Sequence, residues 1–385
     1  MAGNVQRRSN GRWRARYRDE SHREHSRHFA RKIDAQRWLA TVQADMLRGT
    51  YVDPRAGRRT VRDYAEHWRS VQSHRPSTAA QVETHLRRHV YPMLGDRPLG
   101  SVRPSDVRAL VRHMSQSLAP ATVEVVYRYV VAVFRAAVAD RLIVSSPCVG
   151  IRLPVKAPRR VTPRSTADVV ALTAAMGPRY RALVTLGAGT GLRQGEAFAV
   201  ELDHVDLLHR TLRVTQQLLL LAREEPVIAP LKTPSSYRTI PLPAVVAVAL
   251  RAHLVEFPPV EVEVVDTTRG GDPVLRPARL VYSTPEGRPM RRTSFSRQVW
   301  IPAREAAGLP PEVTFHDLRH YYASLLIRHG ESVKVVQARL GHANAAETLD
   351  TYSHLWPDSA DRTRAAVDEA LGEADADSVR TGAAS

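Results

Sequence analysis

Residues 312–356, EVTFHDLRHYYASLLIRHGESVKVVQARLGHANAAETLDTYSHLW, constrain the fold more than any other part of the chain. Apolar residues recur at helical spacing in FHDLRHYYASLLIRHG, and Gly330 and Gly341 readily adopt the left-handed conformation that ends a helix. The pattern therefore predicts three short helices in close succession. The third, AETLDTYSHL, carries Tyr352 and His354.

The first of these helices presents basic side chains on one face. Residues three and four apart share a helix face, so His316, Arg319 and His320 project from the same side of the first turn, where the helix dipole favours an anion. If the three helices converge, His342 and Tyr352 join this cluster. Tyrosine is among the side chains that form covalent intermediates, so the set indicates covalent chemistry at a phosphate.

The composition indicates a large polyanion as the partner. The 385 residues hold 56 Lys and Arg against 39 Asp and Glu, a formal net charge of +17, and nucleic acid fits this excess better than a membrane surface. No apolar run approaches the roughly 20 residues that a membrane span needs. Cys148 is the only cysteine, which excludes an intramolecular disulfide and a Cys-based zinc site. We expect no cofactor and no metal ion.

Residues 1–59 predict a small basic domain. They hold 15 Lys and Arg against six Asp and Glu, more than half of the excess charge of the chain. Arginine alternates with aromatic and small residues in GRWRARYR, the period of a half-buried strand with one basic face, and a second strand-like segment ends at Phe29. Asp34 is the expected N-cap of a helix that Gly49 ends. The expected domain is α+β, with a three-stranded sheet and one helix.

The arginines of the first basic strand are the candidate DNA-binding residues: Arg12, Arg14, Arg16 and Arg18. Charged residues on a strand also protect a sheet edge against aggregation. The alternative is therefore that these arginines only form a solvated edge and do not contact DNA. The density of arginine favours contact with DNA.

Residues 60–150 predict an all-helical domain. Four segments have helical periodicity, and a Ser or Thr lies at or near the start of each one. Residues 151–163 are rich in proline and basic residues and form the expected linker. Such a linker either lets two domains close around a duplex or serves as an ordinary tether.

Residues 164–371 predict a larger, mainly helical domain with some strands. VIAPLKTPSSYRTIPLP has the pattern of a strand, a turn and a strand, which we interpret as a hairpin with Lys232 beside its turn. Residues 258–278 are interpreted as a variable excursion. SADRTRAAVDEAL predicts a final amphipathic helix, and residues 372–385 predict a disordered polar tail.

Six residues of this domain are informative as an ordered set: Arg193 in TGLRQGE, Lys232 in KTPSSYR, His316 and Arg319 in HDLR, His342 in LGH and Tyr352 in TYSH. Each motif alone is a weak signal. Together they resemble the tyrosine recombinase, or phage integrase, family over residues 164–371. The basic first domain and the helical second domain are similar in architecture to those of integrases of temperate phages and integrative elements.

The resemblance implies a multidomain fold. Residues 1–59 would be an arm-type DNA-binding domain, and residues 60–150 a helical, SAM-like core-binding domain. Residues 164–371 would be the catalytic domain, mixed and mainly α with a small β-sheet.

The resemblance also implies a reaction that needs neither ATP nor a metal ion. Tyr352 attacks a scissile DNA phosphate and leaves a 3′-phosphotyrosine and a free 5′-hydroxyl. A phenol with an ordinary pKa near ~10 needs help at neutral pH, and His316 is the implied acid/base for its proton. Lys232 protonates the departing 5′-oxygen.

The remaining implied roles concern the phosphate. Arg193 and Arg319 hold its non-bridging oxygens through forked donors that lysine cannot imitate, and His342 adds a further donor. Glu196 supports the site by orienting Arg193.

Two other interpretations of the first helix are weaker. His316 and His320 have the spacing of a zinc-binding HExxH motif, but Arg319 would put a positive charge beside the metal and no third ligand is apparent. Tyr321 and Tyr322 are poor candidates for the nucleophile, since Tyr322 fits the core stripe of the helix.

We therefore expect a site-specific recombinase that integrates or excises a phage or mobile element. The expected partners are double-stranded DNA at core and arm attachment sites, three further copies of the chain in a tetramer, a DNA-bending host protein and a directionality factor. The expected location is the bacterial cytoplasm, at the nucleoid. One alternative is a host Xer-like recombinase that resolves chromosome dimers and usually lacks a domain like residues 1–59. Another is a catalytically silent DNA-binding regulator on the same fold.

Overall fold

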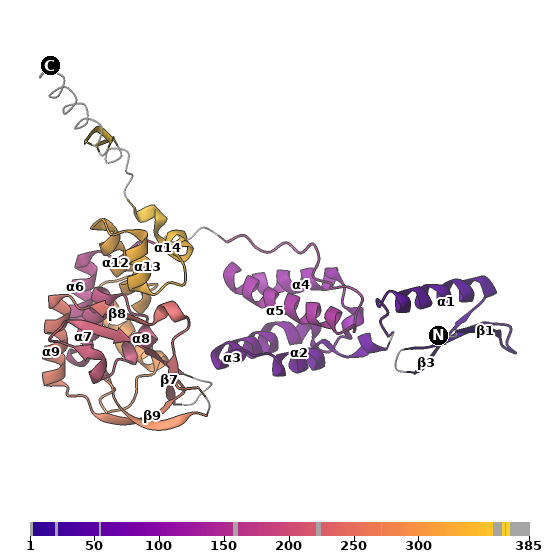
Figure 1. Cartoon of the computed structure of the whole chain (residues 1–385), viewed down its shortest axis with the longest axis horizontal. Helices are drawn as coiled ribbons and strands as arrows, with labels where there is room; N and C mark the ends of the chain where they lie inside the picture. Colours follow the sequence, from indigo (N-terminus) through magenta and orange to yellow (C-terminus); the bar gives the residue numbers. More distant parts are fainter. Residues whose placement is uncertain are drawn as a thin grey trace, which may run out of the picture. The chain divides into compact units, whose positions relative to one another are not determined.

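The computed structural model of the chain describes residues 3–19, 22–53, 55–156, 161–220, 225–270 and 272–356, with helical positions at 364, 365 and 367–369. The chain forms two compact units, Met1–Ala157 and Pro158–Ser385 (Figure 1). The tail expected at 372–385 lies outside the described residues. None of the helices in these ranges has the length and apolar composition needed to cross a membrane.

The first unit begins with a three-stranded antiparallel sheet and one helix, as predicted. The strands β1 (Asn4–Arg7), β2 (Trp13–Arg18) and β3 (Glu24–Phe29) lie in that order, and α1 (Lys32–Leu47) packs against them (Figure 1). Ala15 and Tyr17 of β2 are buried in the core shared with α1. The helix begins earlier than predicted, because its N-cap is Arg31 and Asp34 lies within the first turn.

Four helices form the rest of the first unit, which confirms the predicted helical domain: α2 (Val61–Ser70), α3 (Pro76–His85), α4 (Pro104–Ser115) and α5 (Pro120–Ala139). Thr60 is the N-cap of α2, and its side chain accepts a hydrogen bond from the Asp63 N–H. Helix α3 continues directly into the π-helical segment η2 (Leu86–Gly95), which contains Pro92. Proline lacks the N–H of a regular α-helical turn, which explains the wider helix there. Short 3-10 turns, η1 (Ala56–Arg58) and η3 (Leu99–Ser101), complete the unit.

The second unit is mainly helical, as predicted. Its helices are α6 (Thr166–Ala175), α7 (Pro178–Thr190), α8 (Gln194–Phe198), α9 (Ala244–Glu256), α10 (Arg292–Phe295), α11 (Ile301–Ala306), α12 (Phe315–Arg328), α13 (Val333–Leu340) and α14 (Ala345–Tyr352). Shorter helical turns are η4 (Leu202–His204), η5 (Pro234–Ser236), η6 (Ser296–Trp300) and η7 (Ser353–Leu355). Helix α7 contacts α6, α8, α9 and α12 and therefore lies at the centre of this unit.

Two small sheets flank these helices. The strands β6 (Gln216–Leu220), β7 (Pro226–Pro230), β9 (Glu261–Asp266) and β10 (Val274–Arg279) form one sheet in the order β10-β9-β7-β6. The strands β4 (Val205–Asp206), β5 (Thr211–Val214) and β8 (Arg238–Pro241) form the other in the order β4-β5-β8. The segment interpreted as a variable excursion thus contains two paired strands, β9 and β10.

The predicted hairpin around Lys232 is wrong, because β7 and β8 belong to different sheets. Leu231 and Ser236 are buried, so the connection between the two strands turns into the domain. Pro230 and Pro234 lack the N–H donors that a continued strand ladder requires.

Candidate active site

Glu196 binds two arginines that come from separate parts of the second unit. It lies in α8, is 3% exposed, and accepts hydrogen bonds from Arg193 Nη1 at 2.8 Å and from Arg238 Nη2 at 2.9 Å. Burial alone would raise the pKa of Glu196, but the charges of Arg238 and Arg193 hold that pKa below its usual range. Arg238 also donates to the carbonyl of Arg339 in α13. The carboxylate therefore holds the Arg193 guanidinium in place at the start of α8.

Arg319 of α12 is 1% exposed and binds the turn that precedes Arg193. Its Nη1 donates to the carbonyl of Gly191 at 2.8 Å. Gly191 has φ +64°, and a Cβ there would lie 2.5 Å from the Tyr322 ring, so glycine is required at this close approach. Within the described part of the chain, the buried Nη2 of Arg319 has no hydrogen-bond partner, and burial lowers the pKa of the guanidinium to about 9. An anion at Nη2 would satisfy this donor.

His342 enters the site because α13 ends at Gly341 with φ +67°. The Gly341 carbonyl accepts a hydrogen bond from Arg193 Nη2 at 3.4 Å. His342 is 6% exposed, and its Nδ1 lies 2.8 Å from Thr348 Oγ1 of α14. Burial, assisted by the charge of Arg319, lowers the pKa of His342 to about 4. The ring is therefore neutral at pH 7.

Tyr352 is the last residue of α14, and its phenol is enclosed in the domain. It is 1% exposed, and its Oη lies 2.8 Å from Nδ1 of His320. The His342 ring is nearly parallel to the phenol, with the ring centroids 6.4 Å apart. Burial raises the pKa of Tyr352 to about 12, although Arg319 opposes this rise. At neutral pH the phenol keeps its proton until a neighbouring group accepts it.

His316 lies one turn before His320 on α12, and the two rings meet edge to face with centroids 4.7 Å apart. His316 is exposed and lines a cavity of about 480 Å³ together with Arg193. The atoms packed around part of its ring, and then the charges of His320 and Arg319, lower the pKa of His316 to about 4. Of the two histidines, His316 faces the cavity and His320 contacts the phenol.

Lys232 is exposed on the loop between β7 and the turn η5. This loop adjoins the site, because Ser236 Oγ lies 3.5 Å from Arg193 Nη1. Lys232 thus lies on a loop next to the site. The structure brings the other five predicted residues together in one region: Arg193, His316, Arg319, His342 and Tyr352.

The candidate DNA-binding arginines lie at or on β2 of the first unit: Arg12, Arg14, Arg16 and Arg18. The last three alternate with buried Ala15 and Tyr17, so they occupy the face of the sheet away from α1. Arg12 precedes the strand and is exposed. Glu24 of β3 accepts a hydrogen bond from Arg14 at 2.8 Å and lies 3.9 Å from Arg16.

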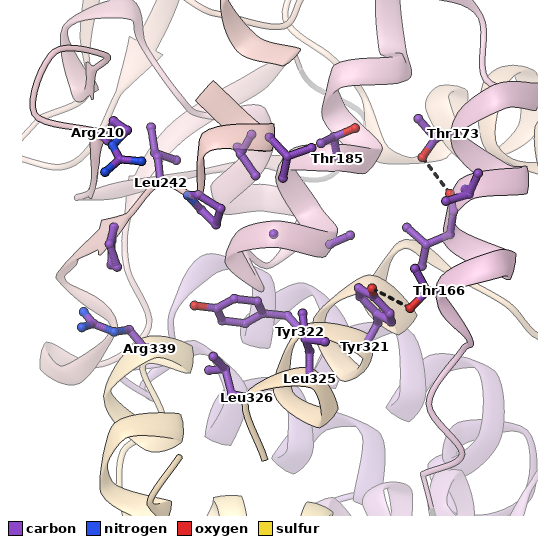
Figure 2. A pocket seen from close by; sticks show the side chains of 18 of the residues that line it. Thr166, Thr173, Thr185, Arg210, Leu242, Tyr321, Tyr322, Leu325, Leu326 and Arg339 are labelled. Atoms are coloured by element: carbon purple, nitrogen blue, oxygen red, sulfur yellow. Dashed lines mark hydrogen bonds between the residues drawn. The ribbon is translucent and has the colours of Figure 1, made fainter. Parts of the chain in front are cut away.

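A larger cavity of about 1170 Å³ lies next to α12 (Figure 2). Tyr322, Leu325 and Leu326 of α12 line one side of it, and Leu242 and Thr185 lie across from them (Figure 2). None of the six predicted active-site residues lines this mainly apolar cavity.

Two residues outside the predicted set belong to the site. His320 has a sequence signal, its spacing of four from His316, but that spacing does not tell which histidine meets the tyrosine. No feature of the sequence around Arg238 indicates that its side chain binds Glu196, which lies 42 residues earlier. Asp317 of the HDLRH motif accepts hydrogen bonds from the N–H and the hydroxyl of Thr314, so it caps the start of α12.

Three family models match the chain. The model described as "Phage integrase family" matches residues 165–358, which is just over half of the chain. The model "Phage integrase, N-terminal domain" matches residues 1–48, and "Phage integrase central domain" matches residues 58–153.

Several relatives are similar to the chain in sequence. An integrase of Mycobacterium phage D29 is 27% identical over 329 residues, which cover 82% of each chain. A putative prophage phiRv2 integrase of Mycobacterium tuberculosis is 26% identical over 361 residues, which cover 91% of each chain. A tyrosine recombinase XerD of Corynebacterium glutamicum is 30% identical over 184 residues, 47% of this chain and 50% of its own.

Solved structures share the fold. The Tn1549 transposon integrase in complex with a circular intermediate DNA has a TM-score of 0.66 and 21% identity, covering 80% of this chain and 99% of its own. A lambda integrase dimer bound to a core site has a TM-score of 0.58 and 17% identity, covering 94% and 96%. A lambda integrase tetramer bound to a Holliday junction has a TM-score of 0.56 and 17% identity, covering 90% and 97%.

The buried His342 should make the stability of the second unit depend on pH. Its pKa of about 4 in the folded protein lies below the ~6.5 of a free histidine, so the unfolded chain binds this proton more readily. The free energy of unfolding should therefore fall as the pH drops from about 6.5 to 4, by at most about 1.4 kcal/mol per pH unit from this residue. Urea titrations at several pH values measure the slope. His342→Asn should lower this slope, with His316 still contributing, whereas His329→Asn, at an exposed position after α12, should leave it unchanged.

Proposed function

Because the chain belongs to the phage integrase family and is a site-specific DNA recombinase, we propose that it cuts and rejoins strands through a covalent bond between Tyr352 and a DNA phosphate. The proposed reaction centre has six residues: Arg193, Lys232, His316, Arg319, His342 and Tyr352. The observation that carries the proposal is the buried Arg319, whose Nη2 has no hydrogen-bond partner among the described residues. A buried cation next to a phenol suits a site that binds a phosphate and attacks it.

Arg193 and Arg319 hold the two non-bridging oxygens in this proposal. Their planar guanidinium groups match a phosphate and stabilise the charge that builds in the transition state. Glu196 orients Arg193, and neutral His342 adds a donor. The support for these roles is geometric: Glu196 and Gly341 fix two nitrogens of Arg193, and the Gly191 carbonyl fixes one nitrogen of Arg319.

Cleavage yields a 3′-phosphotyrosine and a free 5′-hydroxyl, and the covalent bond conserves the energy needed to rejoin the strands. Lys232 protonates the departing 5′-oxygen, and its exposed loop beside Arg193 supports this role. His316 acts as an acid/base group on the cavity side of the site, where it lies with Arg193.

A duplex nicked near the crossover, from which the cleaved fragment escapes, should trap the covalent protein–DNA adduct. Tyr352→Phe should abolish the adduct, because the attacking oxygen is gone, and gel electrophoresis under denaturing conditions measures it. Tyr321→Phe is the matched control and should retain the adduct, since Tyr321 bonds to Thr166 instead. Adduct formation by Tyr352→Phe would disprove the nucleophile, and loss of the wild-type adduct in EDTA would disprove a metal-free reaction.

The proposed substrate is double-stranded DNA with core and arm attachment sites in a bacterial cell. The family match over residues 1–48 supports an integrase rather than a chromosome-dimer-resolving recombinase, since the latter usually lacks such a domain. Residues 60–150 would bind the core site, and residues 1–59 the arm site. A chain that binds both sites but forms no adduct would be a silent regulator.

Arm-site binding should depend on the outer face of β2. Arg16→Ala should weaken binding to arm-site DNA and lower the slope of log affinity against log salt by about one, as expected for one lost phosphate contact. Fluorescence anisotropy at several salt concentrations measures both. Arg37→Ala is the control, because Arg37 is exposed on α1. Equal losses in the two variants would show that the sheet face is not the binding surface.

We also propose that four copies assemble on DNA, with a DNA-bending host protein and a directionality factor controlling the outcome. The C-terminal helix predicted by SADRTRAAVDEAL would dock on a neighbouring copy, and the apolar cavity beside α12 is its proposed acceptor.

A chain that ends at Trp356 should then form fewer tetramers on core-site DNA while still binding that DNA as a monomer. Native gel electrophoresis at matched protein concentrations separates the two species. An unchanged fraction of tetramers would mean that the segment packs on its own domain.

A further inference from the structure

The phenol oxygen that performs the proposed attack is hydrogen-bonded to a histidine outside the six residues of the proposed centre. Oη of Tyr352 lies 2.8 Å from Nδ1 of His320, and the two ring centroids are 5.6 Å apart. His320 is carried by α12, the helix that also carries Arg319. The imidazole thus contacts the atom that would bond to phosphorus.

An attacking phenol must lose its proton, and its surroundings leave few acceptors. Tyr352 is only 1% exposed, and its pKa of about 12 keeps the proton on the phenol at neutral pH. A base within hydrogen-bond reach is therefore required for efficient attack.

The other titratable groups near the phenol are less suited to this step. Nδ1 of His342 lies 2.8 Å from Thr348 Oγ1 and its Nε2 lies 3.8 Å from Glu347 Oε1. The His342 ring is nearly parallel to the phenol, with the ring centroids 6.4 Å apart. His316 faces the cavity that it shares with Arg193. Glu347 accepts a hydrogen bond from the Ala343 N–H and is half exposed.

We propose that His320, rather than His316, is the catalytic base that accepts the proton of Tyr352. The phenol O–H donates to Nδ1 of the neutral ring, which carries its own proton on Nε2. His316 then remains available on the cavity side, next to Arg193. This inference rests on the proposed role of Tyr352 as the nucleophile.

The step balances within the proposed reaction. The Oη–H bond breaks and its proton moves to Nδ1 of His320, while Oη forms a bond to phosphorus. The bond between phosphorus and the 5′-oxygen breaks, and the departing oxygen takes a proton from Lys232. On rejoining, the 5′-hydroxyl returns its proton to Lys232 and bonds to phosphorus. The bond between phosphorus and Oη breaks, and His320 returns its proton to the phenol.

Single-turnover cleavage of the nicked duplex by the full chain tests the assignment. His320→Ala should slow cleavage by about 100-fold or more, the usual contribution of acid–base catalysis. His320→Asn should be nearly as slow, because its side chain can hydrogen-bond to the phenol near the position of Nδ1 but cannot take the proton. His329→Ala, at the exposed C-cap that follows the same helix, is the matched control and should cleave at the wild-type rate. Circular dichroism and DNA affinity establish that each variant is folded and binds DNA.

A substrate with sulfur in place of the bridging 5′-oxygen separates the two proton transfers, because a thiolate leaves without protonation. This substrate should restore cleavage by Lys232→Ala but not by His320→Ala. Restoration of both variants would assign His320 to the leaving group and overturn the proposal.

Two further outcomes would overturn it. A wild-type rate for His320→Asn would make His320 a positioning residue, and faster cleavage by His320→Ala would make its hydrogen bond a restraint on Tyr352. In each of these cases Tyr352→Phe would still form no adduct. Adduct formation by Tyr352→Phe would instead disprove the underlying nucleophile.

Discussion

The buried carboxylate of Glu196 is the interaction on which the proposed reaction centre depends most. It binds Arg193 and Arg238, and Arg238 in turn donates to the carbonyl of Arg339. The ionised side chain of Glu196 thereby connects the start of α8 to β8 and, through Arg238, to α13. These segments are far apart in the sequence. Removing one partner of a buried ion pair leaves an uncompensated charge. A single substitution of Glu196, Arg193 or Arg238 should therefore destabilise the other two.

Arg319 shows the opposite arrangement. Its guanidinium is buried, donates to one backbone carbonyl, and leaves Nη2 without a hydrogen-bond partner among the described residues. Such a donor lowers the stability of the free protein and strengthens binding of an anion that satisfies it. The neutral state of His342 and the protonated state of Tyr352 follow from the same low exposure to water. The protein without DNA is thus less stable because of the same groups that are proposed to bind the phosphate.

Local signals predicted much of the fold, and they failed where partners are distant in the sequence. The helices that end at Gly330 and Gly341 followed from periodicity and glycine alone, and the arginine alternation in β2 predicted its two faces. The hairpin around Lys232 was wrong, because no local feature shows that β8 pairs with β5 instead of β7. Strand β9 had a signal, the alternation in EVEVVD, yet its pairing with β7 is parallel and needs a long connection.

The sequence by itself determined the chemistry available to this protein: which side chains it carries, their order along the chain, and the glycines that allow tight turns. From these the family and the six candidate residues could be inferred. Only the tertiary structure decided which histidine contacts the phenol. Helical spacing puts His316 and His320 on the same face of α12, so the spacing alone does not tell which of them contacts the phenol. The position of α14 relative to α12 separates them, since it brings Tyr352 to His320 and leaves His316 at the cavity.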